Sequence, residues 1–228
     1  MKRILLIAAL LAGCAAIPPP APVAIPAPDN AASWYRQAEA AGAKVLVIDP
    51  ARSLITVTVR RGGPLARLGH DHVVASRGVT GFAAPVEGRA DFSFRLDQMT
   101  VDEPALRVEA GLDTQPSDDA IAGTRTNMLT RVLEADRFPV VAMHVQQLKG
   151  NGKGAREAFR MAITLHGVTR NVTVPAAMES GADGVTAAGT LTLAQTDFGI
   201  TPMSILGGAM TVLDPMELRF RIVARSPR

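Results

Sequence analysis

An alternation of apolar and polar residues, interrupted by one short turn, constrains the fold of this chain more than any other feature. Phe159, Met161 and Ile163 alternate with polar or small residues, and the same pattern resumes in residues 172–179. Period two is the spacing of a strand that has one sheltered face. Gly167, within the turn over residues 166–170, suits a tight connection. The segment predicts a β-hairpin in an antiparallel sheet, with an edge, bulge or bend at Pro175, which has no N–H to donate.

Similar strand patterns recur along the chain. They cover residues 45–48, 53–60, 73–83, 89–97, 140–148, 184–195 and 216–225, and a mixed segment predicts a further strand over residues 106–112. A short helix is expected over residues 33–41, with Trp34 and Tyr35 plugging one end of the domain, and a second helix begins at the acidic pair Asp118 and Asp119. No long helical pattern separates the strands, which argues against crossover connections. An antiparallel meander of this size forms a sandwich or a barrel, and we favour a barrel because closure removes exposed edges.

The N-terminus has the pattern of a secretory signal. Lys2 and Arg3 precede a short apolar run, and Leu11-Ala12-Gly13-Cys14 follows. This sequence resembles the lipobox of bacterial lipoproteins, which implies that Cys14 carries the acyl chains and becomes the first residue. The alternative is an ordinary cleaved signal with an incidental cysteine. Residues 1–13 are interpreted as the signal peptide, 14–32 as an acylated cysteine with a proline-rich tether, and 33–228 as the folded domain. An alanine at position 15, in place of an acidic residue, resembles the signal for sorting to the outer membrane, so the expected location is the periplasmic side of the outer membrane.

Two histidines around an aspartate are the strongest candidates for chemistry. His70 and His72 flank Asp71, and alternate strand residues can present two imidazoles to a metal, with His144 or His166 as a third ligand. Three interpretations stay open: hydrogen bonds to loop backbone beside Arg67, a metal or haem site, and acid/base catalysis. The sequence has no nucleophile-elbow pattern and no phosphate-binding glycine loop. Its basic residues are scattered, with a net charge of +3, which gives no reason to expect nucleic-acid binding.

Four segments together resemble the YceI-like family. They are Val47-Ile48-Asp49-Pro50 followed by Ser53, TNMLTRVLEADRFPVVAMHV (residues 126–145), ITLHGVTRNVTVPA (residues 163–176) and FGITPMSILGGAMTVLDPMEL (residues 198–218). The resemblance extends over about residues 44–224. The family commonly has His-Ser where this chain has Arg52-Ser53, and the Gly69-His70-Asp71-His72 sequence resembles a divergent branch. The resemblance implies an all-β fold: an extended, antiparallel, up-and-down, lipocalin-like β-barrel with one inserted helix and a short N-terminal helix, enclosing an apolar tunnel for polyisoprenoid chains.

The resulting expectation is a lipid-binding protein without covalent chemistry, cofactor or metal. Its partners are a polyisoprenoid or other long lipid and, through Cys14, a membrane. Many methionines and few aromatic residues favour a flexible aliphatic ligand. The alternative is a metal- or haem-associated redox accessory protein or enzyme that uses the histidines of residues 69–72. Eleven residues are expected to line the tunnel: Phe92, Phe94, Phe159, Met161, Ile163, Val172, Val174, Leu191, Leu193, Leu218 and Phe220. Met203 and Leu206 are expected near its opening.

Overall fold

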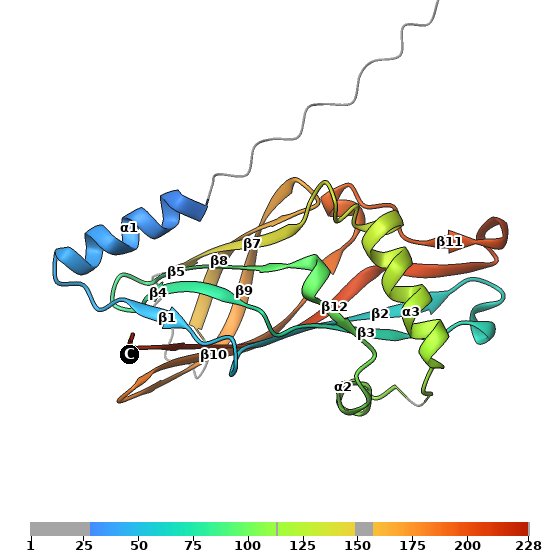
Figure 1. Cartoon of the computed structure of the whole chain (residues 1–228), viewed down its shortest axis with the longest axis horizontal. Helices are drawn as coiled ribbons and strands as arrows, with labels where there is room; N and C mark the ends of the chain where they lie inside the picture. The colour runs from blue at the N-terminus through green and yellow to red at the C-terminus, as the bar shows by residue number, and fades with distance from the viewer. Residues whose placement is uncertain (1–27, 113, 149–156, 228) are drawn as a thin grey trace, which may run out of the picture.

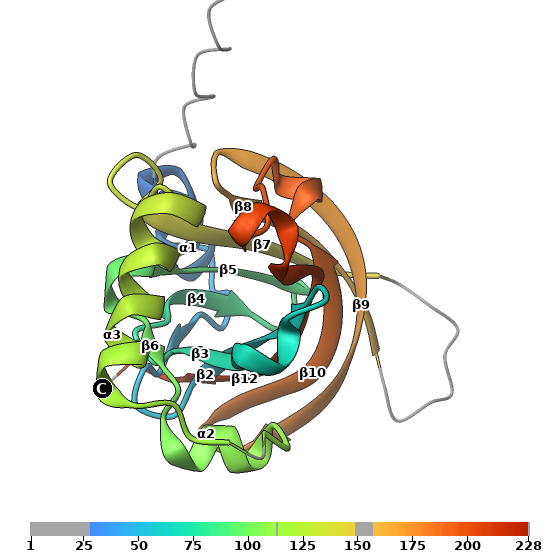
Figure 2. The same ribbon diagram turned by 90° about the vertical axis from the view of Figure 1, so that its right-hand side faces the viewer.

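One antiparallel sheet curls into a closed ring in the computed structural model, which describes residues 28–112, 114–148 and 157–227 (Figures 1 and 2). β1 pairs with both β4 and β12, and these pairings close an eight-stranded ring. The predicted lipocalin-like, all-β barrel is therefore confirmed. In ring order the strands are β1 (Leu46–Ile48), β4 (Thr80–Ala84), β5 (Arg89–Arg95), β7 (Val140–Gln147), β8 (Glu157–Leu165), β9 (Val168–Gly181), β10 (Gly184–Ala194) and β12 (Met210–Arg225).

A second set of strands extends the wall at one end of the ring. β12 pairs with β2 (Leu54–Gly62) as far as Arg221 and with β1 at Ala224 and Arg225, so it changes partner near its end. β2 pairs in turn with β3 (His72–Ser76), and β3 pairs with β6 (Thr100–Val101). β11 (Ser204–Ile205) pairs with β12. α3 (Asp118–Asn127) and the π-helical turn η3 (Met128–Val132) stand beside β6 and cover that side of the ring (Figure 2).

The predicted hairpin forms, but its turn is only two residues long, because residues 168–170, expected in the turn, already belong to β9. Leu165 and Val168 are the last paired residues, and His166 and Gly167 both have positive φ, 52° and 74°. Two consecutive positive φ values give the turn whose twist matches that of paired strands. β9 pairs with β10 only from Ala176 onward, so Pro175 lies where β9 leaves its neighbour. This position agrees with the predicted bend.

The N-terminal helix packs on the outside of the barrel. α1 (Pro28–Ala40) begins at Pro28, before the expected residue 33. Tyr35 is 1% exposed, its ring stacks on Phe82, and its hydroxyl donates to Asp91 Oδ2 over 2.8 Å. Phe82 and Asp91 alternate along β4 and β5 with residues that line the interior. α1 therefore covers the outer face of these strands and does not plug an end of the domain.

Two segments differ from the predicted strands. Residues 106–112 were expected to form a strand, but α2 (Pro104–Glu109) occupies this region because Pro104 suits the first turn of a helix. Residues 73–83 form two strands, β3 and β4, that pair in different parts of the wall. The remaining helical turns are η1 (Ala66–Leu68), η2 (Leu96–Gln98), η4 (Thr196–Phe198) and η5 (Leu206–Gly208). Among the described residues, none of the helices combines the length and hydropathy needed to cross a bilayer.

Candidate functional site

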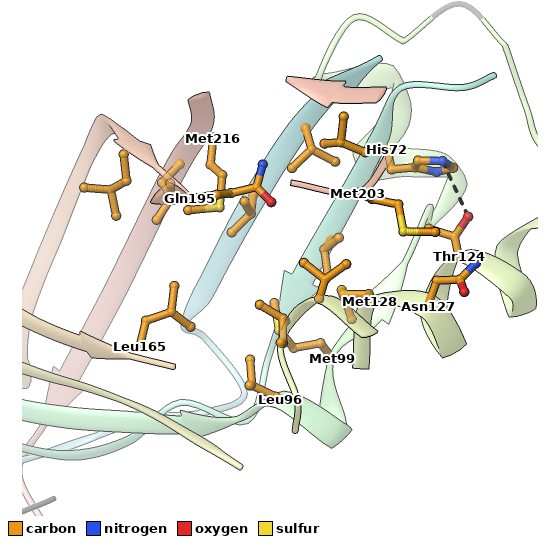
Figure 3. A pocket seen from close by; sticks show the side chains of 18 of the residues that line it. His72, Leu96, Met99, Thr124, Asn127, Met128, Leu165, Gln195, Met203 and Met216 are labelled. Atoms are coloured by element: carbon orange, nitrogen blue, oxygen red, sulfur yellow. Dashed lines mark hydrogen bonds between the residues drawn. The ribbon is translucent and has the colours of Figure 1, made fainter. Parts of the chain in front are cut away.

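A cavity of about 540 Å³ lies between the inward faces of the strands and α3 (Figure 3). Its size is typical of ligand sites. The strand register explains its apolar wall, because Leu218 of β12 lies opposite both Val57 of β2 and Leu191 of β10. Alternation along each strand then directs one apolar row inward. Met128, Val132 and Leu133 complete the wall from the helical side.

Most of the residues expected to line a tunnel do border this space. Nine of the thirteen line the cavity: Phe92, Phe94, Met161, Ile163, Leu191, Leu193, Met203, Leu218 and Phe220. Phe159 and Val174 line a smaller cavity toward the other end, and Val172 packs against the core without lining either space. Leu206 lies outside the wall and is 67% exposed, while its neighbour Ile205 borders the cavity. That any of them contacts a ligand stays a prediction.

The smaller cavity has a volume of about 220 Å³. Phe92, Met161 and Phe220 border both spaces. These three side chains therefore form the boundary between the two cavities, and a ligand longer than the larger cavity would have to pass them. Methionine has three rotatable bonds, so Met161 is the side chain of the three that adjusts most easily.

Sequence reasoning missed several lining residues. Val57, Val59 and Met143 carry the same alternation as the predicted set and were available from the pattern. Thr124 and Asn127 could not be predicted in this way, because no sequence pattern shows that polar residues of a helix face the interior of a barrel. Gln195 also reaches the cavity, and its amide donates to the carbonyl of Leu213 over 2.8 Å (Figure 3).

Exposed apolar side chains surround one end of the larger cavity. Leu68 and Ile205 line the cavity and are nevertheless 62% and 40% exposed. They belong to η1 and β11, which both pack against β12. Leu206 and Leu213 are also exposed, but neither lines the cavity. We call Leu68 and Ile205 the apolar rim, because through them the cavity wall continues to the protein surface.

A histidine supported by a buried carboxylate stands at this end of the cavity. His72 Nδ1 lies 2.6 Å from Asp102 Oδ2, and Nε2 lies 3.5 Å from the hydroxyl of Thr124. Figure 3 shows His72 of β3 together with Thr124 and Asn127 of α3, with Met203 close by. His72 lines the cavity with 14% of its side chain exposed. Because Asp102 fixes the other ring nitrogen, Nε2 is the atom that His72 presents to a ligand.

Asp102 is the centre of a buried polar network. Its other oxygen, Oδ1, accepts from the backbone N–H of Val73 over 3.0 Å and from Arg107 Nη1 over 2.5 Å, and both carboxylate and guanidinium are almost fully buried. Burial alone would raise the pKa of Asp102. The hydrogen bonds that its carboxylate accepts from His72, Val73 and Arg107 lower the pKa below the usual range. Arg107 also donates to the carbonyls of Thr114 and Asp71 over 2.7 and 2.8 Å.

The other histidine interpretations have separate outcomes. Asp71 does bond to backbone, because its Oδ1 accepts from the N–H of Arg61 over 2.8 Å. Its charged partners are Arg60 and Arg61. Among the described residues, Asp71 makes no hydrogen bond or ion pair with Arg67. His70 Nδ1 is buried and has no hydrogen-bond partner among the described residues.

His144 and His166 lie away from this group. They approach Asp91 and Glu134, with nitrogen to oxygen distances of 2.6 and 3.3 Å. Within the ranges that the structure describes, no group of three His, Cys, Asp or Glu residues could hold a metal ion. The predicted anchor, Cys14, lies outside the described residues.

Comparisons with known proteins agree with this architecture. A family model described as the YceI-like domain matches residues 46–224. The fold is similar to a polyisoprenoid-binding domain from Saccharophagus degradans implicated in plant cell wall breakdown, with TM-score 0.54 and 10% identity over 81% of this chain and 99% of the other. It is also similar to BcnA of Burkholderia cenocepacia, with TM-score 0.54 and 13% identity over 77% and 98%. Among curated proteins, no relative matches the sequence.

Proposed function

The chain belongs to the YceI-like domain family, and from that premise we propose that it is a binding protein that holds a long apolar lipid in its barrel. We assign the lipid to the polyisoprenoid class, and we propose that binding involves no covalent chemistry and no cofactor. The observation that carries the proposal is the cavity of about 540 Å³ with its almost wholly apolar wall. The similarity to a solved polyisoprenoid-binding domain supports it through the shared fold.

The energetics of such a wall favour a long chain. Each buried methylene contributes about 0.8 kcal/mol, so ten buried carbons contribute about 8 kcal/mol. Association itself costs about 4 kcal/mol or more in lost translational and rotational freedom. A ten-carbon chain is therefore held weakly, and a chain of about twenty carbons is held well. The apolar rim supports this function, because a lipid that crosses Leu68 and Ile205 remains against apolar surface as it enters.

We further propose that the protein is a lipoprotein on the periplasmic side of a membrane. Cys14 and the proline-rich residues that follow it support this anchor, and Ala15 favours the outer membrane. An anchor of several acyl chains is sufficient for stable attachment. It would keep the cavity close to the bilayer from which its ligand comes.

A substitution in the cavity wall tests the proposed function. Ile163 is 4% exposed and lines the cavity, so Ile163→Trp places an indole in the space that a lipid would occupy. We expect the affinity for geranylgeraniol, measured by equilibrium binding to the whole chain, to fall at least about tenfold. The melting temperature should change little, because the added ring fills empty space. In a solid core the same change would cost about 1 to 3 kcal/mol of stability.

Thr173→Trp is the matched control. Thr173 lies on β9 opposite Arg160 and is exposed on the outer surface, so the same ring added there leaves the cavity unchanged. We expect wild-type affinity for geranylgeraniol in this variant. Unchanged affinity in Ile163→Trp, or a wild-type protein that binds no long-chain lipid, would contradict the proposed function.

A further inference from the structure

We propose that Arg61, His70 and His72 form a subsite for the anionic oxygen head, phosphate or carboxylate, of the lipid in the cavity. We call these three residues the basic cluster. The inference rests on the proposed function, because it requires a lipid in the cavity. It adds the chemical class of the lipid head, which an apolar wall alone does not select.

The strand register brings the three side chains to one place. Val59 of β2 pairs directly with His72 of β3. Arg61 follows Val59 by two residues along β2 and therefore projects from the same face as Val59, and His70 lies two residues before His72 in the loop that leads into β3. Each of them lines the cavity, and the His70 and His72 rings lie 6.2 Å apart, centre to centre. The basic cluster therefore stands at the end of the cavity that the apolar rim surrounds.

Two imidazoles in this cluster have hydrogen-bonding capacity that the described residues leave unused. His70 Nδ1 is buried without a hydrogen-bond partner among the described residues, and a buried polar atom left in that state is costly. His72 Nε2 has only the 3.5 Å contact to Thr124, longer than an ordinary hydrogen bond. The Asp102 carboxylate accepts from Nδ1 and holds the ring so that Nε2 faces the cavity and can share a proton with a ligand oxygen. A ligand oxygen in the cavity would satisfy His72 Nε2, and a turn of the His70 ring would bring its unpaired nitrogen to the same ligand.

The charges around the cavity favour an anion. Among the described residues, the polar side chains that line it are Arg61, His70, His72, Thr124, Asn127, Gln195 and Thr211, and no Asp or Glu lines it. The two nearby carboxylates do not line the cavity, and each has arginine partners: Asp102 pairs with Arg107, and Asp71 with Arg60 and Arg61. Arg61 donates one N–H to the carbonyl of Gly69 over 2.6 Å and has further donors for a ligand.

Three C20 probes separate recognition of the head from retention of the tail. Geranylgeranyl phosphate carries an anionic head, geranylgeraniol a neutral one, and phytane none. We expect the whole chain to bind the phosphate at least about tenfold more tightly than the alcohol, since a charge-assisted hydrogen bond contributes that much or more. Palmitate distinguishes the two sources of anionic oxygen: binding comparable to the phosphate indicates recognition of charge, and preference for the phosphate indicates recognition of its tetrahedral oxygens.

His72→Gln and His70→Gln test the assigned residues. Each should lower the affinity for geranylgeranyl phosphate about tenfold and leave the affinity for geranylgeraniol and phytane unchanged, which also shows that the barrel is intact. His144→Gln is the matched control, because His144 makes the same 2.6 Å contact from Nδ1 to a carboxylate, Asp91, yet does not line the cavity. It should retain the preference for the phosphate.

The outcomes that overturn the proposal are distinct. Equal wild-type affinity for the phosphate, the alcohol and phytane would refute the head subsite while leaving the proposed function intact. The same conclusion follows if both glutamine variants retain the wild-type preference. Failure of all three probes to bind would refute the proposed function and the subsite with it.

Discussion

At the scale of single residues, Asp102 shows best what the sequence does not reveal. It has a left-handed backbone, with φ of 57°, and a fully buried carboxylate that accepts from His72, Val73 and Arg107. Nothing in its sequence neighbourhood marks it, because its partners come from other elements. The functional interest of the His70 to His72 segment was predictable, whereas the carboxylate that orients His72 was not.

Replacing Asp102 by Asn tests this network. Asn tolerates the same backbone conformation, so the change removes mainly the charge. It leaves the buried Arg107 uncompensated and should lower the free energy of unfolding by about 3 to 5 kcal/mol near pH 7. Because folding lowers the pKa of Asp102, the carboxylate stabilises the protein above its unfolded pKa of about 3.9, and this contribution is lost as the pH falls through the folded value.

Denaturant titrations across pH 3 to 8 measure the effect. The difference between Asp102→Asn and wild type should be largest near neutral pH and shrink in acid. Asp97→Asn is the control, because Asp97 pairs with Arg95 on the surface and the change should leave the free energy of unfolding nearly unchanged. A difference for Asp102→Asn that does not vary with pH would mean that its charge is not what stabilises the fold.

At the scale of elements, alternation predicted strands well wherever one face is buried along the whole strand. The hairpin of β8 and β9 is the best case, including its turn at Gly167. Alternation failed over residues 106–112, where an apolar mixture around Arg107 belongs to α2 and Arg107 turns inward to a buried carboxylate. It also failed to divide β3 from β4, because the break at Gly78 arises from pairing with two different strands, β3 with β2 and β4 with β1.

The same substitution at two glycines should have opposite effects. Gly167 has a φ of 74°, and an added Cβ would lie 2.8 Å from Phe138 Cε1, so Gly167→Ala should cost about 1 to 3 kcal/mol. Gly123 lies exposed within α3, and an added Cβ there meets nothing within 4 Å. Gly123→Ala should therefore stabilise by about 0.5 to 1 kcal/mol. Thermal unfolding of both variants checks the pair, and a shift of the same sign in both would contradict this account.

At the scale of the whole molecule, the sequence predicted that the sheet closes into a barrel but not which strands pair to close it. The count of one-sided strands favoured a barrel, yet the pairing of three-residue β1 with both β4 and β12 depends on contacts distant in sequence. Most of the predicted tunnel residues do border the cavities, because inward alternation is a local property. The boundary at Phe92, Met161 and Phe220, and the helical wall with Thr124, arise only when the ring closes.

The predicted anchor is a property of the whole molecule that can be tested separately from the barrel. In wild-type cells the chain should fractionate with membranes, and its intact mass should exceed that of a chain beginning at Cys14 by its acyl groups. Cys14→Ser should remove the added mass and release the protein from the membrane fraction. A variant that still pellets with membranes, with a mass equal to that of wild type, would rule out Cys14 as the anchor.

Native mass spectrometry of the whole chain, extracted gently from its own membranes, tests the central claim most directly. The cavities and their apolar walls predict one non-covalent lipid per chain, released by collisional activation, with a mass consistent with a polyisoprenoid. Ile163→Trp, purified in parallel, should carry much less of it. A wild-type protein without additional mass, together with an Ile163→Trp variant that melts well below it, would show that side chains fill the barrel and that it carries no lipid.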